Sequence, residues 1–237
     1  MIARLTFLGT RAEVEERTEN HYYHSSLLLQ ILQPYSFRLV IDYGTIHSYD
    51  LSILKPDAML ITHAHPDHYI WTTEEANYSV PVYLTRETFN YGNFSPVNPY
   101  IFYPYKSFYL GPFQVFPYRV IHSIRCPAVG FKIRLNDDKI LVYNPDVVDI
   151  IAKENILPGT DYYIGDGSTI NANLVRRKGE NLYGHTRIPT QINWSKEFGV
   201  KNIIFTHIGK DTLRQENRFS EIYPEAILAY DEMKLII

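Results

Sequence analysis

One short segment limits what this chain can fold into more than any other. Residues 61–68 read ITHAHPDH, so an apolar run passes directly into three histidines and an aspartate. In an extended segment alternate side chains point to the same side, which lets His63 and His65 face a single metal ion. The proline then turns the chain, so that Asp67 and His68 can face back to the same place. Imidazoles and a carboxylate suit zinc, iron or manganese and do not suit calcium.

A cluster of exposed histidines without an ion is the alternative interpretation of this segment. Histidine-rich tracts of that kind are usually low in complexity. The histidines of this chain instead follow a strand that we predict at 58–61, where the apolar residues indicate burial. The pattern therefore predicts a metal site at the end of a buried strand.

Length and composition indicate a single globular domain over residues 1–237. The hydrophobic share is 45% and the charged share 21%, as in ordinary soluble domains. A chain of this size buries enough apolar surface to fold without disulfides or a structural metal. Its one cysteine, Cys126, also excludes an internal disulfide. We therefore expect a metal site in this chain to serve chemistry rather than stability.

The charge balance and the hydropathy pattern limit the partners of the chain. Its formal net charge is -3, whereas strong binders of nucleic acid are usually basic. The tight basic run from Arg176 to Lys178 is explained by a solvated loop, so RNA is a less favoured partner. Neither a signal peptide nor an apolar stretch of ~20 residues is visible. We expect a cytoplasmic protein that does not contact a membrane.

Short apolar runs rich in β-branched residues predict strands along most of the chain. The predicted strands lie at 2–8, 26–32, 37–41, 58–61, 113–118, 129–135, 140–143, 161–164 and 202–206. The predicted helices lie at 72–77, 86–91, 147–155, 190–198 and 224–233. A strand-rich core with helices outside indicates an α/β or α+β fold, with two sheets packed face to face.

The aromatic segment at residues 91–118 has two interpretations. The chain contains 20 tyrosines and 12 phenylalanines, and many of them lie in this segment among several prolines. Short buried strands with tyrosine at their rims are the interpretation we favour, because aromatic residues prefer strands. The other interpretation is a substrate pocket or a partner surface, such as the contact of a homodimer.

The HxHxDH pattern at a strand end resembles the signature of the metallo-β-lactamase superfamily. Further motifs follow in order, each at the end of a predicted strand: His122 in VIHSI, Asp146 in LVYNPD and His207 in IIFTHIG. The resemblance begins at the segment FLGT, residues 7–10, and so spans nearly the whole chain. It implies an αββα sandwich, two mixed sheets flanked by helices, with metal ions in a groove along one edge.

The resemblance also implies a centre of two divalent metal ions and assigns its ligands. The first implied site consists of His63, His65 and His122. The second consists of Asp67, His68 and His207, and Asp146 would lie between the two. We expect Zn²⁺, with Mn²⁺ or iron as alternatives.

A supporting carboxylate follows from the segment Asp42-Tyr43-Gly44. It resembles the Asp-x-Gly of the superfamily, in which the aspartate supports a ligand histidine. A turn with a helix-capping aspartate would give the same sequence, and both interpretations can hold together.

Segments around the ligands resemble the phosphodiesterase branch of the superfamily. The start FLGT and the stretch HSIRCPAVGFKI before YNPD resemble transfer-RNA 3′-processing endonucleases and cyclic phosphodiesterases. Gly184-His185-Thr186 stands where a histidine of that branch contacts the scissile phosphate. The resemblance thus implies catalytic roles for His185 and for Asp67, the latter as ligand and proton acceptor. Arg125 is a further candidate for binding phosphate.

A small or cyclic phosphodiester is the substrate that these features favour, cleaved by a hydroxide shared between the two ions. No segment resembles the arm with which the transfer-RNA enzymes hold RNA. A lactonase or other carbon-ester hydrolase with a tyrosine as acid is one alternative, because the ligands alone do not choose the substrate. The other is a metal-binding or di-iron module that works with a partner and hydrolyses nothing.

Overall fold

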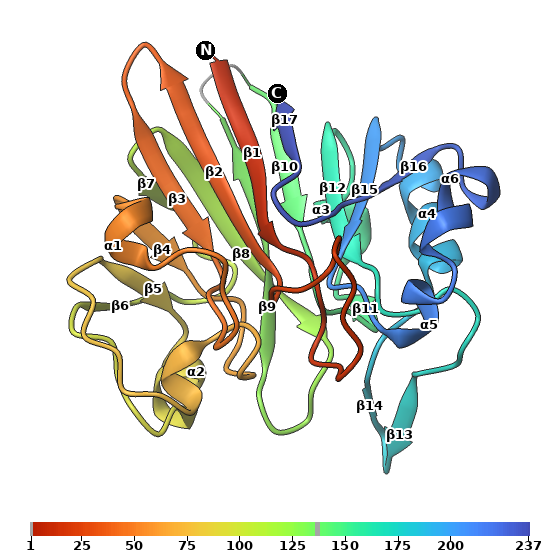
Figure 1. Ribbon diagram of the computed structural model, residues 1–237, viewed down its shortest axis with the longest axis horizontal. Coiled ribbons are helices and arrows are strands. Elements are labelled where there is room, and N and C mark those ends of the chain that lie inside the picture. Colours follow the sequence, from red (N-terminus) through yellow and green to blue (C-terminus); the bar gives the residue numbers. More distant parts are fainter. Residues whose placement is uncertain (1, 136–137) are drawn as a thin grey trace.

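Two mixed β-sheets pack face to face in the computed structural model, which describes residues 2–135 and 138–237, and helices cover their outer sides (Figure 1). The strand order of the first sheet is β17-β1-β2-β3-β4-β5-β6. That of the second is β11-β8-β9-β10-β12-β15-β16, with β7 paired to β8. The expected sandwich of two mixed sheets flanked by helices is confirmed.

The nine predicted strands are all present, with bounds that differ from the predicted ones by at most three residues, and the sheets contain further short strands. The first sheet contains β1 (Ile2–Gly9), β2 (Ser26–Gln33), β3 (Phe37–Ile41), β4 (Ala58–Leu60), β5 (Val82–Leu84), β6 (Pro99–Ile101) and β17 (Lys234–Ile236). The second contains β7 (Phe108–Leu110), β8 (Phe113–Ile121), β9 (Ala128–Arg134), β10 (Ile140–Tyr143), β11 (Asp149–Ile150), β12 (Tyr162–Asp166), β15 (Asn202–Thr206) and β16 (Ala226–Leu228). A separate hairpin consists of β13 (Arg176–Lys178) and β14 (Asn181–Tyr183).

The helices are short and lie mainly outside the sheets. They are α1 (Leu51–Leu54), η1 (Ile70–Thr72), α2 (Arg86–Tyr91), α3 (Lys153–Ile156), α4 (Ile188–Glu197), α5 (Lys210–Leu213), η2 (Glu216–Arg218) and α6 (Phe219–Ile222). Figure 1 shows α1 and α2 beside the first sheet and α4, α5 and α6 beside the second. Among the described helices none has the length and apolar character that a membrane span requires.

The central strands are apolar at consecutive positions because both of their faces are buried. In β2, Leu29 points into the core between the sheets, whereas Leu28 packs into a second cluster with Trp71 of η1. In β15, Ile204 joins the core between the sheets and Phe205 packs into a third cluster, which includes residues of α4. The sandwich thus has four layers.

The carboxyl ends of several strands meet at one edge of the sandwich. β3, β4, β5 and β6 are paired in parallel in the first sheet. β10, β12 and β15 are parallel in the second, and β8 points the same way because both β8 and β10 are antiparallel to β9. Residues that directly follow β4, β8, β10, β12 and β15 are therefore brought toward the same place.

Two of the predicted helices are present, as α2 and α4, and three are wrong. Of the helix predicted at 72–77 only Thr72 is helical, as the last residue of η1, and the Trp71 indole donates to the carbonyl of Ala76 at 2.7 Å. In the segment 147–155, β11 pairs with β8, and only α3 near its end is helical. In the segment 224–233, β16 pairs with β15. Strand pairing overrides the local helical preference in both of the last two segments.

The aromatic segment 91–118 divides between core and surface. Phe102 and Phe113 are buried, as expected for the short strands that run through this segment. Tyr103 and Tyr109 are instead 59% and 73% exposed. A homodimer contact over these exposed rings stays a prediction.

Candidate metal centre

The side chains that the sequence motifs single out converge at the shared edge of the two sheets. The segment after β4 supplies the first four of them, and β8, β10 and β15 each end shortly before one of the others. In chain order they are His63, His65, Asp67, His68, His122, Asp146 and His207. All are buried except His65, which is partly exposed.

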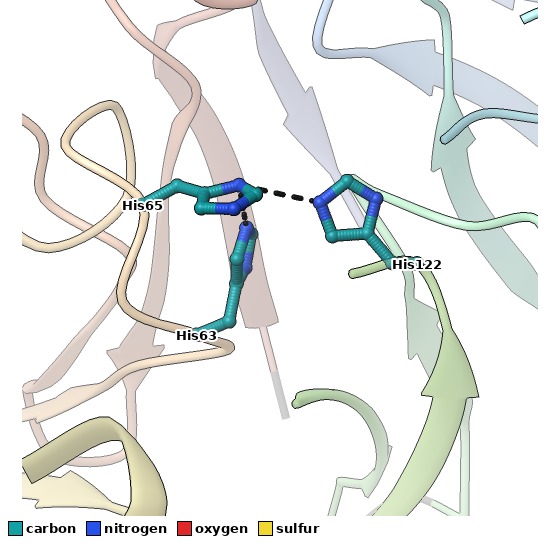
Figure 2. Close-up of side chains that lie close together, drawn as sticks. All are labelled: His63, His65 and His122. Atoms are coloured by element: carbon teal, nitrogen blue, oxygen red, sulfur yellow. Dashed lines mark hydrogen bonds between the residues drawn. The ribbon is translucent and has the colours of Figure 1, made fainter. Parts of the chain in front are cut away.

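His63, His65 and His122 form the first group, in which three ring nitrogens point toward one another (Figure 2). His65 Nδ1 lies 2.9 Å from His63 Nε2 and 3.3 Å from His122 Nε2. A tetrahedral zinc ion with Zn–N bonds of about 2.0–2.1 Å holds its ligand nitrogens about 3.3 Å apart. The spacing of the three imidazoles therefore fits one metal ion.

Asp67, His68 and His207 form the second group. Oδ2 of Asp67 lies 3.1 Å from His207 Nε2 and 3.4 Å from His68 Nε2. Asp146 stands between the groups, with its Oδ2 2.6 Å from His68 Nε2 and 3.7 Å from His63 Nε2. One carboxylate thus faces both groups, as a ligand that bridges two ions would.

Two buried atoms of the cluster lack a hydrogen-bond partner among the described residues. They are His68 Nε2 and Asp146 Oδ2, which lie side by side without the angles of a hydrogen bond. A buried polar atom without a partner is costly. A metal ion between the groups would satisfy both atoms, so the residues present fit a metal centre.

Hydrogen bonds outside the cluster determine which nitrogen of an imidazole faces it. Thr62 Oγ1 lies 3.0 and 2.9 Å from the two carboxylate oxygens of Asp42, so its single proton is donated there. It must then accept the Nδ1 proton of His63 at 3.0 Å, which leaves His63 Nε2 unprotonated toward the centre. His122 donates from Nδ1 to the carbonyl of Gly184 at 3.0 Å, with the same consequence.

Asp42 supports the second group as well. It lies directly after β3, is fully buried, and accepts a hydrogen bond from His68 Nδ1 at 2.9 Å. It also accepts one from the backbone N of Thr62 at 2.8 Å. The Asp-x-Gly segment therefore places a carboxylate where it orients a candidate ligand.

Burial and charge act differently on the two groups. Burial lowers the pKa of His122 to about 4. Burial, with the charge of His65, holds the pKa of His63 well below its ordinary value. Burial also lowers the pKa of His207, but nearby carboxylates, Asp146 first, more than offset this and raise it to about 10. The first group is therefore neutral, which is the form that binds metal, while the carboxylates of the second attract a cation.

Asp166, which no sequence motif singles out, joins the cluster at the end of β12. Its Oδ2 accepts a hydrogen bond from His185 Nδ1 at 2.8 Å. Asp166, His185, Asp146 and His207 also form a group of potential ligands. An aspartate at the end of a buried strand is the sequence signal that could have identified it. The predicted strand at 161–164 ends two residues before Asp166, so this signal was missed.

His185 lies beside the cluster, as the Gly184-His185-Thr186 segment predicts. Its Nδ1 is 3.3 Å from Asp146 Oδ1. Burial lowers the pKa of His185, but the carboxylate of Asp166 more than offsets this, so that the pKa is raised. Ser168 is a second residue without a sequence signal, and its Oγ lies 3.0 Å from His207 Nδ1.

A cavity of about 490 Å³ opens onto the cluster. Its described lining consists of Ala12, Glu13, Val14, His65, Asp67, His122, Asp146, Ser168, Ala172, Leu174, His185, His207, Gly209, Lys210, Asp211 and Arg214. Arg125 is not among these residues and is exposed in the turn after β8, so its role in binding phosphate stays a prediction. The cations of the lining are instead Lys210 of α5, which is paired with Glu16, and the exposed Arg214.

The architecture and the site together define the class of protein: the chain has the metallo-β-lactamase fold. The metallo-β-lactamase fold protein YhfI from Bacillus subtilis is 20% identical, with a TM-score of 0.70 over 100% of this chain and 99% of that one. A diphosphatase from the PhnP family is 19% identical, with a TM-score of 0.72 over 100% and 98%. Human tRNase Z, short form, is 16% identical, with a TM-score of 0.66 over 98% of each chain. No protein-family model and no curated protein sequence matches the chain.

Proposed function

We propose that this protein is a binuclear metal-dependent hydrolase that cleaves a small phosphodiester. The observation that carries the proposal is the position of Asp146, whose carboxylate faces both histidine groups at the floor of the cavity. Zn²⁺ is the ion that the nitrogen-rich first group favours. When bound, two such ions activate a water molecule and neutralise charge on a phosphate oxygen.

Two residues of the chain would transfer protons and stabilise charge during the reaction. Asp67 reaches the cavity beside His207, so its carboxylate would be placed to accept a proton from the attacking water. His185 reaches the cavity from another side and is held as an imidazolium by Asp166. It is placed to stabilise charge on the phosphate or to protonate the leaving oxygen.

The cavity supports a compact substrate. Its volume of about 490 Å³ suits a small molecule. Imidazoles are the only aromatic rings among its described lining, so a nucleobase would find little to stack on. The likeness to a PhnP-family diphosphatase and to human tRNase Z supports phosphate chemistry. The net charge of -3 favours the small substrate over a folded RNA.

The lactonase alternative uses a tyrosine as acid. The described residues that line the cavity include no tyrosine, which weakens this alternative. A metal-binding or di-iron module without hydrolytic activity would not need His185 to be held as an imidazolium beside Asp146. We therefore prefer the phosphodiesterase.

Turnover of bis-p-nitrophenyl phosphate and of a lactone panel tests the proposal on the Zn²⁺- or Mn²⁺-loaded protein. We expect cleavage of the phosphodiester, and a loss of about 10²- to 10⁴-fold in His185→Ala. His47→Ala is the matched control, since His47 does not line the cavity. Lactone turnover with an inert phosphodiester would reject the phosphodiesterase and leave the metal centre unaffected.

A further inference from the structure

Two acidic side chains of the cavity lining, Glu13 and Asp211, have no part in the chemistry proposed above, and Asp211 is already held by hydrogen bonds from the backbone N atoms of residues 170–172. Glu13 lies on the loop after β1 and lines the cavity with Ala12 and Val14. Within residues 2–135 and 138–237 its carboxylate forms no hydrogen bond or ion pair. Of the two cations of the lining, Lys210 is paired with Glu16, and Arg214 forms no ion pair with Glu13.

The loop fixes the position of Glu13. The backbone N of Ala12 donates to the carbonyl of Ile208 at 3.1 Å, directly after the last candidate ligand. The carbonyl of Val14 accepts a hydrogen bond from the buried guanidinium of Arg11. Both neighbours of Glu13 are therefore anchored, so the backbone holds this exposed side chain at the cavity.

Glu13 lines the same cavity as Asp67 and His207 of the second group, although its side chain is exposed. Partial burial raises the pKa of Glu13, and the negative charge of Asp67 raises it further, while His68 and His207 act in the opposite direction. A phosphodiester bound at the centre would extend past this carboxylate. Glu13 would repel an anionic extension and attract a cationic one. An apolar extension would cost this carboxylate part of its hydration.

We infer that Glu13 selects phosphodiesters that carry a protonated amino group, with the phosphate at the metal centre and the ammonium at Glu13. This inference rests on the proposed function and names its substrate class. Val14, Ala172 and Leu174 supply an apolar wall that suits a short aliphatic spacer between the two charges. The substrate would thus be a compact zwitterion.

Calorimetric binding of aminoethyl phosphate and ethyl phosphate to the metal-loaded protein tests the inference without turnover. We expect the wild type to bind the amino compound about 10-fold or more tightly than the ethyl compound, because a charged partner strengthens a hydrogen bond to this extent. Glu13→Gln should abolish the preference. Glu15→Gln should keep it, because Glu15 is an exposed carboxylate of the same loop outside the cavity lining.

Turnover of aminoethyl and ethyl p-nitrophenyl phosphate, which share a leaving group, gives a second readout. The wild type should prefer the amino ester, mainly through KM, and Glu13→Gln should not. Equal binding of the two phosphates by the wild type, or a preference that survives in Glu13→Gln, would overturn the inference. Hydroxyethyl phosphate bound as tightly as the amino compound would overturn the requirement for charge. Selective binding without cleavage of either ester would reject the proposed hydrolysis and keep the role of Glu13.

Discussion

His185 donates a hydrogen bond from Nδ1 to Oδ2 of Asp166 over 2.8 Å, which links the cavity to the buried end of β12. Asp166 is itself fixed by the backbone N of Val147, at 3.0 Å, and that of Ser168, at 2.9 Å. The ring of His185 therefore stands beside Asp146 in a set orientation, and Asp166 raises its pKa. In the proposed phosphate chemistry, protonated His185 would supply positive charge beside the metal centre.

Replacing Asp166 tests whether this pair acts in turnover. Asp166 raises the pKa of His185 above 6.5, so wild-type turnover should persist above this pH and fall as pH rises through the raised pKa. In Asp166→Asn that fall should move to lower pH, with an overall loss of about 10²-fold. The pH dependence of kcat/KM measures both effects. Asp149→Asn, at a partly buried carboxylate that is paired with Lys153 outside the cavity lining, serves as control. A basic limb that does not move in Asp166→Asn would contradict the role.

Replacing Asp42 tests the support of the second group. Asp42→Ala removes the acceptor of His68 Nδ1, and loss of such a contact typically weakens metal affinity by about 10- to 100-fold. Competition with a chromogenic chelator measures the affinity. Asp57→Ala, at an exposed carboxylate before β4, should leave it unchanged. Equal affinities of the two variants would show that Asp42 does not orient a ligand.

His24 makes stability depend on pH. Burial lowers its pKa from 6.5 to about 4, and its Nδ1 accepts a hydrogen bond from the backbone N of Ile46 at 3.3 Å. Between these pKa values the unfolded chain binds more protons, so the free energy of unfolding falls as pH falls through this window. One such histidine lowers the free energy of unfolding by about 2 kcal/mol between about pH 7 and pH 5. Urea unfolding at both pH values should show a smaller loss for His24→Gln than for the wild type, and equal losses would refute this.

The thiol of Cys126 should be inert in the folded protein. Its side chain is buried, and Sγ accepts a hydrogen bond from the backbone N of Ala64 at 2.9 Å. Burial raises its pKa to about 11, so little thiolate forms near neutral pH. A disulfide reagent such as Ellman's should react slowly with the folded protein and rapidly in denaturant. Rapid reaction without denaturant would mean that the loop around Ala64 opens readily.

The ligand positions could be predicted because strand ends are local features. Apolar runs mark where β4, β8, β10 and β15 end, and the residues that follow include every candidate ligand that the motifs assign. Asp166 was missed because no motif of the resemblance marks it, and the predicted strand 161–164 stops two residues short of it. The predictions of helices at 147–155 and 224–233 were wrong because these segments contain β11 and β16. Those strands pair with β8 and β15, which lie elsewhere in the chain.

Residues on loops were the hardest to assign from sequence. Arg125 follows His122 closely in the chain, yet it is exposed in a turn outside the cavity lining. Glu13 and Arg214 are far apart in the chain, and tertiary packing brings both to the cavity. No periodicity or motif marks such residues, because loop conformation is set by the elements that the loop joins.

Zinc content and bis-p-nitrophenyl phosphate turnover, measured on the same samples of wild type and Asp146→Ala, test the central claim most directly. We predict about two zinc ions per wild-type chain and turnover that depends on them. In Asp146→Ala we predict fewer bound ions and lost turnover. A wild type that binds no zinc, or an Asp146→Ala variant with full zinc and full turnover, would contradict the binuclear centre.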